Sequence, residues 1–288
     1  MPSPLILTSA TELLARYDVL LCDIWGVVHD GRVAYPGANV VLPAFRARGG
    51  TVILVSNAPM TAPAIAGLLA DKGVRRDGWD AIVASGDLAL THIAEHGYRR
   101  IYGIGPRPRD DSFFDAVPQL IESLDDADAI ACTGLIHERT ETADHYRSLL
   151  QRALARRLPF VCVNPDLAVH VGADLLPCAG AIAAVYETMG GRVFWGGKPH
   201  PVAYETGLAT AARLRGAAVA KSRVLGIGDA VRTDLKAAAG AGVDALFIAG
   251  GLHRDELIHG DLLDVARLSE LLHAHDAEPV AVMRALTP

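Results

Sequence analysis

The sequence predicts an α/β protein built on parallel sheets, with a second α/β domain inserted into the first. Three observations lead to this fold class. Short apolar runs alternate with amphipathic or alanine-rich helical stretches along almost the whole 288-residue chain. The runs are apolar at every position rather than at alternate positions, which is typical of strands covered on both faces of a sheet. A helical stretch follows nearly every run, as in the βαβ units that build parallel sheets.

The predicted strands also indicate where a functional site would lie, because ligands of parallel α/β sheets bind at the carboxyl ends of the strands. In chain order the strands comprise residues 18–23, 51–57, 80–85, 100–105, 128–133, 159–164, 192–197, 223–229 and 244–249. Polar residues stand at several of these ends, namely Asp23, Ser56 with Asn57, Asn164 with Asp166, and Asp229. The polar segment 107–129 is predicted to form surface helix and loop.

The composition is that of an ordinary globular protein, with 51% apolar and 21% charged residues. A formal net charge of -6 argues against a nucleic-acid-binding protein. No apolar run reaches the roughly 18 residues of a membrane-spanning helix, and the N-terminus lacks the basic region of a signal peptide. The four cysteines are widely spaced, which favours buried thiols in a reducing compartment. We expect a cytoplasmic protein with no nucleic-acid or membrane partner.

A long interval separates the segment "VSNAP", which contains Ser56, from the segment "GGKPHP", which contains Lys198. Connections within a compact fold usually span only about 2–6 residues. This interval has its own alternation of strands and helices, so we expect it to form a domain of its own. The predicted inserted domain covers residues 82–187, and the predicted core consists of residues 1–81 and 188–288.

Four segments carry residues suited to phosphate chemistry. Asp23 lies in "DIWGV" and Ser56 with Asn57 in "VSNAP". Lys198 follows two glycines in "GGKPHPVAY" and precedes a proline that is expected to open a helix. The last segment, "GIGDAVRTDLKAA", places Asp229 at a strand end and Asp234 near a helix start.

These residue types match the needs of phosphoryl transfer. A carboxylate can attack phosphorus only if a cation offsets the repulsion between the two anions. Asp23 and Asp229 offer the hard oxygen ligands that Mg²⁺ prefers. Lys198 would neutralise phosphate charge, while the Ser56 hydroxyl and the amides of Asn57 would bind phosphoryl oxygens.

The four segments, in this order, resemble the motifs of the haloacid dehalogenase (HAD) superfamily. Within it they are similar to the class IIA phosphatases, which include NagD-like and 4-nitrophenylphosphatase-like enzymes. The resemblance covers nearly the whole chain. It implies a Rossmann-like HAD core with a parallel sheet, and an inserted α/β class II cap domain at 82–187 that covers the active site.

The resemblance also implies an activity and a set of roles. The activity is Mg²⁺-dependent hydrolysis of a small phosphorylated metabolite through an aspartyl-phosphate intermediate. Asp23 would be the nucleophile, Ser56 the phosphate binder and Lys198 the group that neutralises charge. Asp229 would be a magnesium ligand, and Asp234 would support the metal shell.

Trp25 departs from the family pattern. The phosphatases carry an aspartate at this position, two residues after the nucleophile, whose side chain is the general acid and whose backbone carbonyl binds the metal. Trp25 keeps the carbonyl, and with Gly26 it would border the bound phosphate, but the acid is lost. Such a loss typically lowers the rate by about 10²–10⁴-fold. Two alternatives therefore stay open: a haloacid dehalogenase-type hydrolase, which needs no acid for a halide, and a catalytically weak protein that binds a phosphate ligand.

Several polar residues allow two interpretations. Asp234 near a helix start is favourable for the helix itself. Asn164 and Asp166 could contact substrate or form an Asx turn. His29 is the nearest alternative proton donor to Asp23, although a position in a flap loop is the simpler interpretation.

Two predictions concern the inserted domain. The segment "ASGD" at 84–87 could frame a hinge or provide a helix N-cap at Ser85 or Asp87. The apolar segment "AGAIAAVY" at 179–186 exceeds what one small sheet would bury, and class IIA relatives often self-associate through the cap. We therefore expect a homodimer formed through this domain.

Overall fold

The computed structural model describes residues 5–171, 174–260 and 262–288, and in it the chain forms two compact units. The first unit comprises the chain up to Ser56, Ala66–Val83 and Ala203–Pro288. The second comprises Asn57–Ile65 and Ala84–Val202. The long segment of the second unit begins close to the predicted residue 82 but ends later than the predicted residue 187. The unit also includes residues 57–65, which were predicted to belong to the core. Motif spacing alone could not indicate this, because the segment around Asn57 is held to the segment around Lys198 by side-chain contacts.

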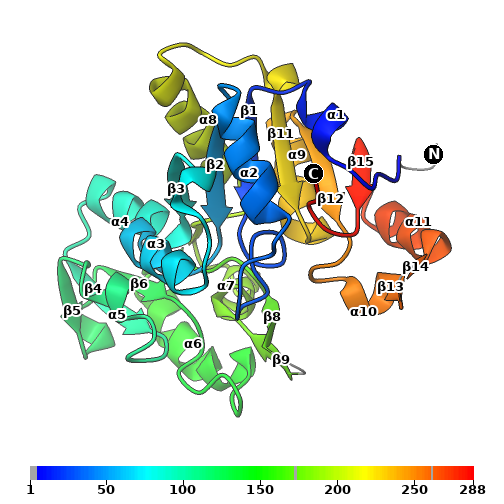
Figure 1. Cartoon of the computed structure of the whole chain (residues 1–288). Helices are drawn as coiled ribbons and strands as arrows, with labels where there is room; N and C mark the ends of the chain where they lie inside the picture. The colour runs from blue at the N-terminus through cyan, green and yellow to red at the C-terminus, as the bar shows by residue number, and fades with distance from the viewer. Residues whose placement is uncertain (1–4, 172–173, 261) are drawn as a thin grey trace. The chain divides into compact units, whose positions relative to one another are not determined.

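A six-stranded sheet forms the centre of the first unit (Figure 1). Its order is β15-β12-β11-β1-β2-β3, and β1 pairs in parallel with both β2 and β11. This arrangement brings the carboxyl ends of β2, β1 and β11 side by side. The strands of this unit are β1 (Val19–Asp23), β2 (Thr51–Ser56), β3 (Ala81–Ala84), β11 (Val224–Gly228), β12 (Asp244–Ile248), β13 (Ile258–His259), β14 (Leu262–Leu263) and β15 (Ala281–Met283).

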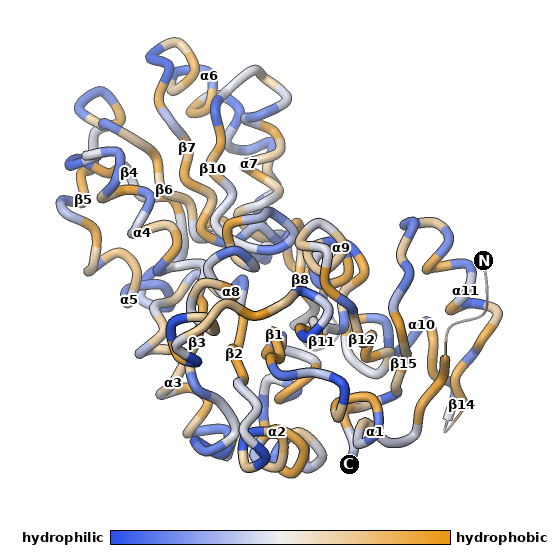
Figure 2. The backbone as a smooth tube through the Cα atoms, turned by 90° about the horizontal axis from the view of Figure 1, so that it is seen from above, coloured by the Kyte–Doolittle hydropathy of each residue, from blue (hydrophilic) through white to orange (hydrophobic). Residues whose placement is uncertain are grey.

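Helices cover both faces of this sheet. Figure 2 shows α1 and α2 on one side of the strands and α8 and α9 on the other. Two glycines let α8 approach closely: a Cβ on Gly207 would lie 3.0 Å from the Leu21 side chain, and one on Gly226 would lie 2.7 Å from the Tyr204 hydroxyl. The helices in or entering this unit are α1 (Thr11–Leu14), α2 (Ala38–Ala47), α3 (Ala62–Asp71), α8 (Pro201–Arg215), α9 (Lys236–Ala241), α10 (Arg254–Leu257) and α11 (Val265–Ala274).

The second unit has its own five-stranded parallel sheet, in the order β10-β7-β6-β4-β5. A separate antiparallel pair, β8 with β9, precedes helix α7. The strands are β4 (Arg100–Ile104), β5 (Gln119–Ile121), β6 (Ala129–Cys132), β7 (Phe160–Cys162), β8 (Ala168–Val171), β9 (Asp174–Pro177) and β10 (Val193–Trp195). The helices are α4 (Ser85–Glu95), α5 (Asp111–Phe114), α6 (Arg147–Ala155) and α7 (Ala179–Thr188).

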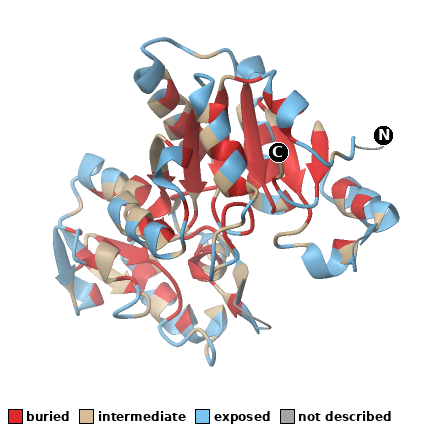
Figure 3. Cartoon of the chain, in the orientation of Figure 1, coloured by how far each residue is buried: buried red, intermediate tan, exposed pale blue. Residues whose placement is uncertain are grey.

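Each sheet is buried along its central strands, as Figure 3 shows. Residues Val19–Cys22 of β1 and Ala129–Cys132 of β6 are fully buried. Such strands bury apolar side chains on both faces, which explains why the sequence shows continuous apolar runs rather than alternation. The predicted α/β fold class with parallel sheets is confirmed, and every predicted strand is present.

The structure bears on one of the two grounds for the predicted homodimer. Helix α7 contains the apolar segment from which self-association was inferred. Its residues Ile182, Ala183 and Tyr186 are fully buried in the core of the second unit itself. These three residues therefore offer no surface to a partner, while Ala181, Ala184 and Val185 of the same segment are partly exposed. The homodimer stays a prediction.

The interpretation of residues 107–129 as surface helix and loop is only partly right. The segment contains a short helix, α5, but also the edge strand β5. Phe113 and Phe114 are buried in the core of the second unit. The strand was missed because β5 has only three residues and two of them are exposed, so no continuous apolar run marks it.

All four cysteines are buried and none forms a disulfide, as predicted. Burial raises the pKa of the Cys178 thiol to about 12. Among the helices described, none is both long enough and apolar enough to cross a bilayer.

Candidate active site

Three carboxylates meet at the carboxyl ends of β1 and β11. Asp23 is the last residue of β1, Asp229 follows β11 directly, and Asp234 lies on the π-helical turn Val231–Leu235. One oxygen from each of the three lies within 4.8 Å of the others. Asp229 and Asp234 are buried, with 4% and 2% of their surface exposed. The structure thus brings together the three acidic residues that the sequence singled out.

Asp229 lies in a seat formed by two backbone segments. Its Oδ2 accepts a hydrogen bond of 2.7 Å from the Leu252 amide. A Cβ on Gly251 would lie 2.1 Å from this oxygen, and a Cβ on Gly26 only 1.8 Å from it. Gly26 also has a φ of +79°, a conformation that side chains disfavour. Glycine is therefore required at both positions for the Asp229 carboxylate to occupy this place.

Asp234 is held by the loop that leaves β11. Its Oδ2 accepts a hydrogen bond from the Ala230 amide at 3.1 Å. A Cβ on Gly228 would lie 2.1 Å from Cγ of Asp234, so glycine at the end of β11 makes room for this carboxylate. This bond ties Asp234 to the start of the helical turn, and the same residue also belongs to the acidic cluster.

Ser56 ends β2, the strand next to β1. The register pairs Asp23 with Val55, so Ser56 follows immediately beyond the level of the carboxylate. It is partly exposed. The predicted phosphate binder and the predicted nucleophile therefore stand at adjacent strand ends of the same sheet.

Asn57 and Lys198 lie in the second unit, where the Asn57 side chain holds the Lys198 backbone. Its Oδ1 accepts from the Lys198 amide at 2.8 Å, and its Nδ2 donates to the Lys198 carbonyl at 2.9 Å. Nδ2 also donates to Oδ1 of Asp166 at 2.9 Å. The Asn57 side chain is thus a brace for the lysine segment, so the prediction that Asn57 binds phosphate concerns its backbone amide.

The segment that carries Lys198 is closely packed. Lys198 itself is 3% exposed. A Cβ on Gly197 would lie 2.4 Å from both Oδ1 of Asn57 and Oγ of Ser85, so the second glycine before the lysine is required for this packing. The lysine–proline peptide is cis, and helix α8 begins at Pro201. We expected the proline directly after Lys198 to open the helix, but the helix begins at the second proline of the segment, Pro201.

The structure also shows the local hydrogen bonds of the polar residues in the second unit. The Asp166 amide donates to Oδ1 of Asn164 at 3.1 Å, which is an Asx turn. Oδ2 of Asp87 accepts from the Ala62 amide at 2.8 Å, so Asp87 caps the start of α3 rather than its own helix α4. Burial raises the pKa of Asp87 above its ordinary value, and this hydrogen bond opposes the rise.

Trp25 lies in the turn that follows β1, and its side chain is 52% exposed. The indole ring meets the His29 ring edge-on, with the ring centres 5.3 Å apart and the planes at 69°. A Cβ on Gly31 would lie 2.7 Å from the six-membered part of the indole, so the ring lies against the Gly31 backbone. The indole itself offers no carboxylic acid at this position.

His29 is unsuited to replace that acid. It is 1% exposed, and its Nδ1 accepts a hydrogen bond of 2.8 Å from the Gly31 amide. Burial, helped by the charge of Lys72, lowers the pKa of His29 to about 4. The imidazole is therefore neutral near pH 7 and has no readily donated proton. The flap interpretation of His29 fits this structure better than a catalytic one.

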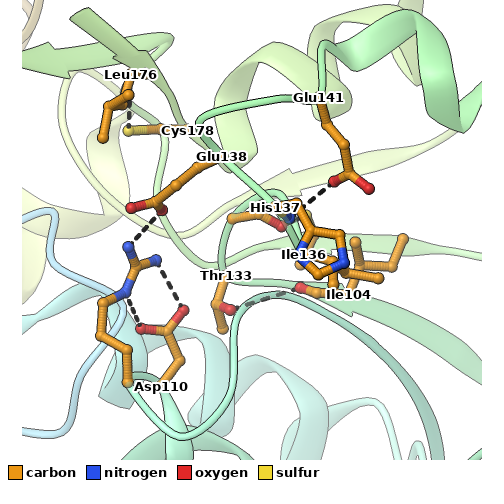
Figure 4. A network of polar contacts seen from close by, with 12 residues as sticks. Ile104, Asp110, Thr133, Ile136, His137, Glu138, Glu141, Leu176 and Cys178 are labelled. Atoms are coloured by element: carbon orange, nitrogen blue, oxygen red, sulfur yellow. Dashed lines mark hydrogen bonds and ion pairs between the residues drawn. The ribbon is translucent and has the colours of Figure 1, made fainter. Parts of the chain in front are cut away.

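The second unit contains a polar network that the sequence did not reveal (Figure 4). Arg109 donates to both oxygens of Asp110 and also pairs with Glu138. Asp110 is 1% exposed. Burial works to lower the pKa of Arg109, but its bonds to the two carboxylates outweigh burial and raise it. Asp110 and Glu138 come from loops that follow β4 and β6, so no local pattern joins them.

The acidic cluster fits a hard divalent cation. It supplies carboxylate oxygens only, which are the ligands that Mg²⁺ and Ca²⁺ prefer. Within the described residues, no other group of three or more histidines, cysteines or acidic residues has this geometry. A carboxylate at a strand end, beside such a cation, is suited to attack an electrophilic centre such as phosphorus.

Comparison with known proteins identifies the fold family. Residues 20–117 match the family model described as haloacid dehalogenase-like hydrolase, and residues 195–271 match a second model described as HAD-hydrolase-like. The solved structure of a haloacid dehalogenase-like family hydrolase from Brucella suis 1330 is 40% identical, covers 100% of both chains and superposes with a TM-score of 0.82.

Two further relatives are more distant. Ribonucleotide monophosphatase NagD of Escherichia coli strain K12 is 26% identical over 239 residues, which is 81% of this chain and 88% of that protein. The structure of glycerol phosphate phosphatase from Mycobacterium tuberculosis, in complex with calcium, is 25% identical with a TM-score of 0.63. It covers 83% of this chain and 68% of that chain. The chain described here belongs to the haloacid dehalogenase-like hydrolases, in their class IIA, NagD-like branch.

Proposed function

We propose that this protein is a Mg²⁺-dependent phosphatase that hydrolyses a small phosphorylated metabolite through an aspartyl-phosphate on Asp23. The observation that carries this function is the meeting of Asp23, Asp229 and Asp234, with one oxygen of each within 4.8 Å of the others. Two relatives, a ribonucleotide monophosphatase and a glycerol phosphate phosphatase, support phosphate monoesters as the substrate class.

Asp23, the Trp25 carbonyl and Asp229 would hold the cation, with Asp234 supporting the shell. When bound, Mg²⁺ would offset the negative charge shared by the nucleophile and the phosphate. One relative has been solved in complex with calcium, another hard divalent cation. The buried seat of Asp229, closed by Gly26 and Gly251, supports a fixed ligand at this position.

In the first chemical step a carboxylate oxygen of Asp23 attacks phosphorus, and the bond from phosphorus to the leaving oxygen breaks. The leaving group departs with the electron pair. The Ser56 hydroxyl and the Asn57 amide bind phosphoryl oxygens, and the Lys198 ammonium neutralises their charge. In the second step water attacks the phosphorus of the aspartyl-phosphate, which releases phosphate and restores the Asp23 carboxylate.

Trp25 and His29 set limits on this reaction. Neither can protonate the leaving oxygen near pH 7, because one is an indole and the other is a buried neutral imidazole. Turnover should therefore be slow for alkyl phosphates and faster for esters whose leaving group is stable as an anion. Loss of general acid–base catalysis typically lowers a rate by about 10²–10⁴-fold.

A haloacid dehalogenase-type reaction is the second candidate, and the half-exposed Trp25 favours it. Halide departs without a proton, so a missing acid would carry no penalty. The buried pair Asp229 and Asp234 favours the phosphatase instead, because displacement of a halide by Asp23 does not require a cation. The third candidate, a weak phosphate-ligand binder, would retain binding without turnover.

We further propose that the second unit acts as a cap that limits substrates to small molecules. Its identity as a cap rests on its position in the chain, between the segments of Ser56 and Lys198. A cytoplasmic location suits the four buried thiols, since free cysteines persist in reducing compartments.

A substrate screen would test this function directly. Purified protein would be assayed against phosphate esters and haloacids, with Mg²⁺ and with EDTA, alongside Asp23→Asn. We expect phosphate release that depends on Mg²⁺ and is abolished in Asp23→Asn. Halide release that persists in EDTA would favour the dehalogenase, and full phosphatase activity in Asp23→Asn would exclude Asp23 as the nucleophile.

A further inference from the structure

The proposed reaction leaves one feature without a role, the exposed indole of Trp25 in the turn that follows Asp23. Trp25 is 52% exposed although it stands only two residues after Asp23. Large aromatic side chains are costly to leave in water, since burying one is worth about 1.5–3 kcal/mol. An exposed tryptophan so close in the chain to the proposed nucleophile therefore suggests a ligand that covers it.

The indole is held in one place rather than free to turn. Its six-membered ring lies against the Gly31 backbone, and it makes a T-shaped contact with the buried His29 ring. His29 is itself fixed, because its Nδ1 accepts from the Gly31 amide and its carbonyl accepts from the Gly26 amide at 2.9 Å. A preset aromatic surface loses little conformational entropy when a ligand stacks on it.

A second exposed apolar residue lies on a segment that contacts Asp229. Leu252 is 42% exposed, and its amide donates to Asp229. The segment that carries it is a direct neighbour of the turn that carries Trp25, because a Cβ on Gly26 would lie 3.3 Å from the Gly251 Cα. Trp25 precedes Gly26, and Leu252 follows Gly251. Both glycines pack on the Asp229 carboxylate.

We propose that Trp25 is a specificity-determining residue whose ring, together with Leu252 on the adjoining segment, binds a flat aromatic leaving group of the phosphate ester. This inference rests on the proposed phosphatase function and names its substrate class as aryl phosphates. Stacking against an indole favours a planar ring over a flexible polyol. The same substitution removes the general acid, and an aromatic alcohol needs that acid less than an alkyl alcohol does because its anion is more stable.

Binding of inert analogues would test the stacking surface without any turnover. Phenylphosphonate and methylphosphonate both present a phosphonate group, and only the first carries a ring. With the full chain and excess Mg²⁺, calorimetry should show tighter binding of phenylphosphonate to the wild type. In Trp25→Leu the ratio of the two affinities should fall about fivefold, the size expected for one aromatic pair.

Two variants and a control sharpen this experiment. Trp25→Phe keeps a ring and should retain most of the preference, which a merely structural role for the indole would not predict. Leu252→Ser removes the second apolar side chain, should also lower the ratio, and carries the test if Trp25→Leu does not fold. Val33→Ala is the matched control, because Val33 is 60% exposed in the same loop but does not adjoin either glycine.

Each outcome bears on a distinct claim. Loss of the preference in Trp25→Leu, with retention in Trp25→Phe and Val33→Ala, would support the assignment. Equal affinity of the wild type for the two phosphonates, or an unchanged ratio in Trp25→Leu, would overturn the aromatic site while leaving the phosphatase function standing. Failure of both phosphonates to bind would overturn the aromatic site together with the phosphate site on which it depends.

Discussion

The side chain of Asn57 makes a reciprocal pair of hydrogen bonds with the backbone of Lys198, accepting from its amide at 2.8 Å and donating to its carbonyl at 2.9 Å. The two residues are 141 positions apart in the chain. Asn57 directly follows Ser56, so this pair links the predicted phosphate-binding segment to the segment that carries the Lys198 ammonium. An amide side chain is required here, because one position must accept and the other must donate.

Asn57→Asp should weaken the presentation of Lys198. The new carboxylate would face the Lys198 carbonyl and the Asp166 carboxylate, where the amide had donated to both. We expect the free energy of unfolding to fall by about 1–3 kcal/mol. We expect kcat/KM for phosphate esters to fall by up to about 100-fold, since small misplacements of a catalytic group have effects of this size.

Asn39→Asp is the matched control for this substitution. The Asn39 side chain also joins two backbone groups, donating to the Gly73 carbonyl and accepting from the Arg75 amide, but it lies away from the acidic cluster and is partly exposed. It should leave kcat/KM nearly unchanged. Equal loss of activity in both variants would indicate that Asn57 acts only through general stability.

Gly251→Ala should disable the acidic cluster without unfolding the protein. The new Cβ would lie 2.1 Å from Oδ2 of Asp229 and would displace the carboxylate. We expect the Mg²⁺ affinity measured by calorimetry to fall at least about 10-fold, as for other residues that orient a metal ligand. Gly240→Ala is the control, because nothing lies within 4 Å of its Cβ and its helix should be slightly stabilised. Unchanged Mg²⁺ affinity in Gly251→Ala would rule out Asp229 as a ligand.

The wild type should show a burst with 4-nitrophenyl phosphate. The first step can proceed because nitrophenolate leaves without a proton, whereas water attack on the aspartyl-phosphate lacks a general base. The intermediate should then accumulate, so that a rapid release of nitrophenol precedes slow turnover. Rapid-mixing absorbance measurements would reveal it, and Asp23→Asn should show neither phase.

Trp25→Asp tests the cause of the burst. It should raise kcat, with a larger relative gain on alkyl phosphates, whose leaving groups need protonation. The ring is half exposed, so its removal should leave no large cavity. If aromatic leaving groups stack on the indole, KM for nitrophenyl phosphate should rise at the same time. Brisk turnover of alkyl phosphates by the wild type, without a burst, would mean that another residue supplies the acid.

His92 should make the stability of the second unit depend on pH. Its ring stacks on Phe194 at 3.8 Å and lies 3.9 Å from the ring of His96. Burial, together with the charge of His96, lowers the pKa of His92 to about 4, below its ordinary value of 6.5. Between these values the unfolded chain binds a proton that the folded chain does not. The contribution of the neutral His92 ring to the free energy of unfolding is therefore fully present above pH 6.5, and it is lost as the pH falls toward 4.

His92→Phe keeps the stack and removes the titration. Its free energy of unfolding should fall less steeply than that of the wild type between pH 6.5 and pH 4, as measured by denaturant titration at several pH values. His275→Phe is the control, because His275 is exposed and follows α11. An identical pH dependence in His92→Phe and wild type would exclude the buried imidazole as its source.

The sequence by itself was sufficient for the fold class and for the members of the acidic cluster. Buried parallel strands leave continuous apolar runs, and a residue at the carboxyl end of such a run must lie at one edge of the sheet. Asp23 and Asp229 were identified in this way. The fold class and these strand-end positions both depend on local pattern, which the sequence contains in full. The edge strand β5 was missed for the converse reason, since a short strand that is half exposed leaves no such run.

Only the tertiary structure decided which groups support the cluster and which do not take part in it. The brace between Asn57 and Lys198, the seat of Asp229 against Gly251, and the burial that lowers the pKa of His29 each join residues without a shared local pattern or depend on the packing around them. Hydrogen bonds and desolvation act over a few ångströms in space, whatever the separation along the chain. Periodicity and motif spacing therefore identify the residues of a site, but their contacts and protonation follow from the folded packing.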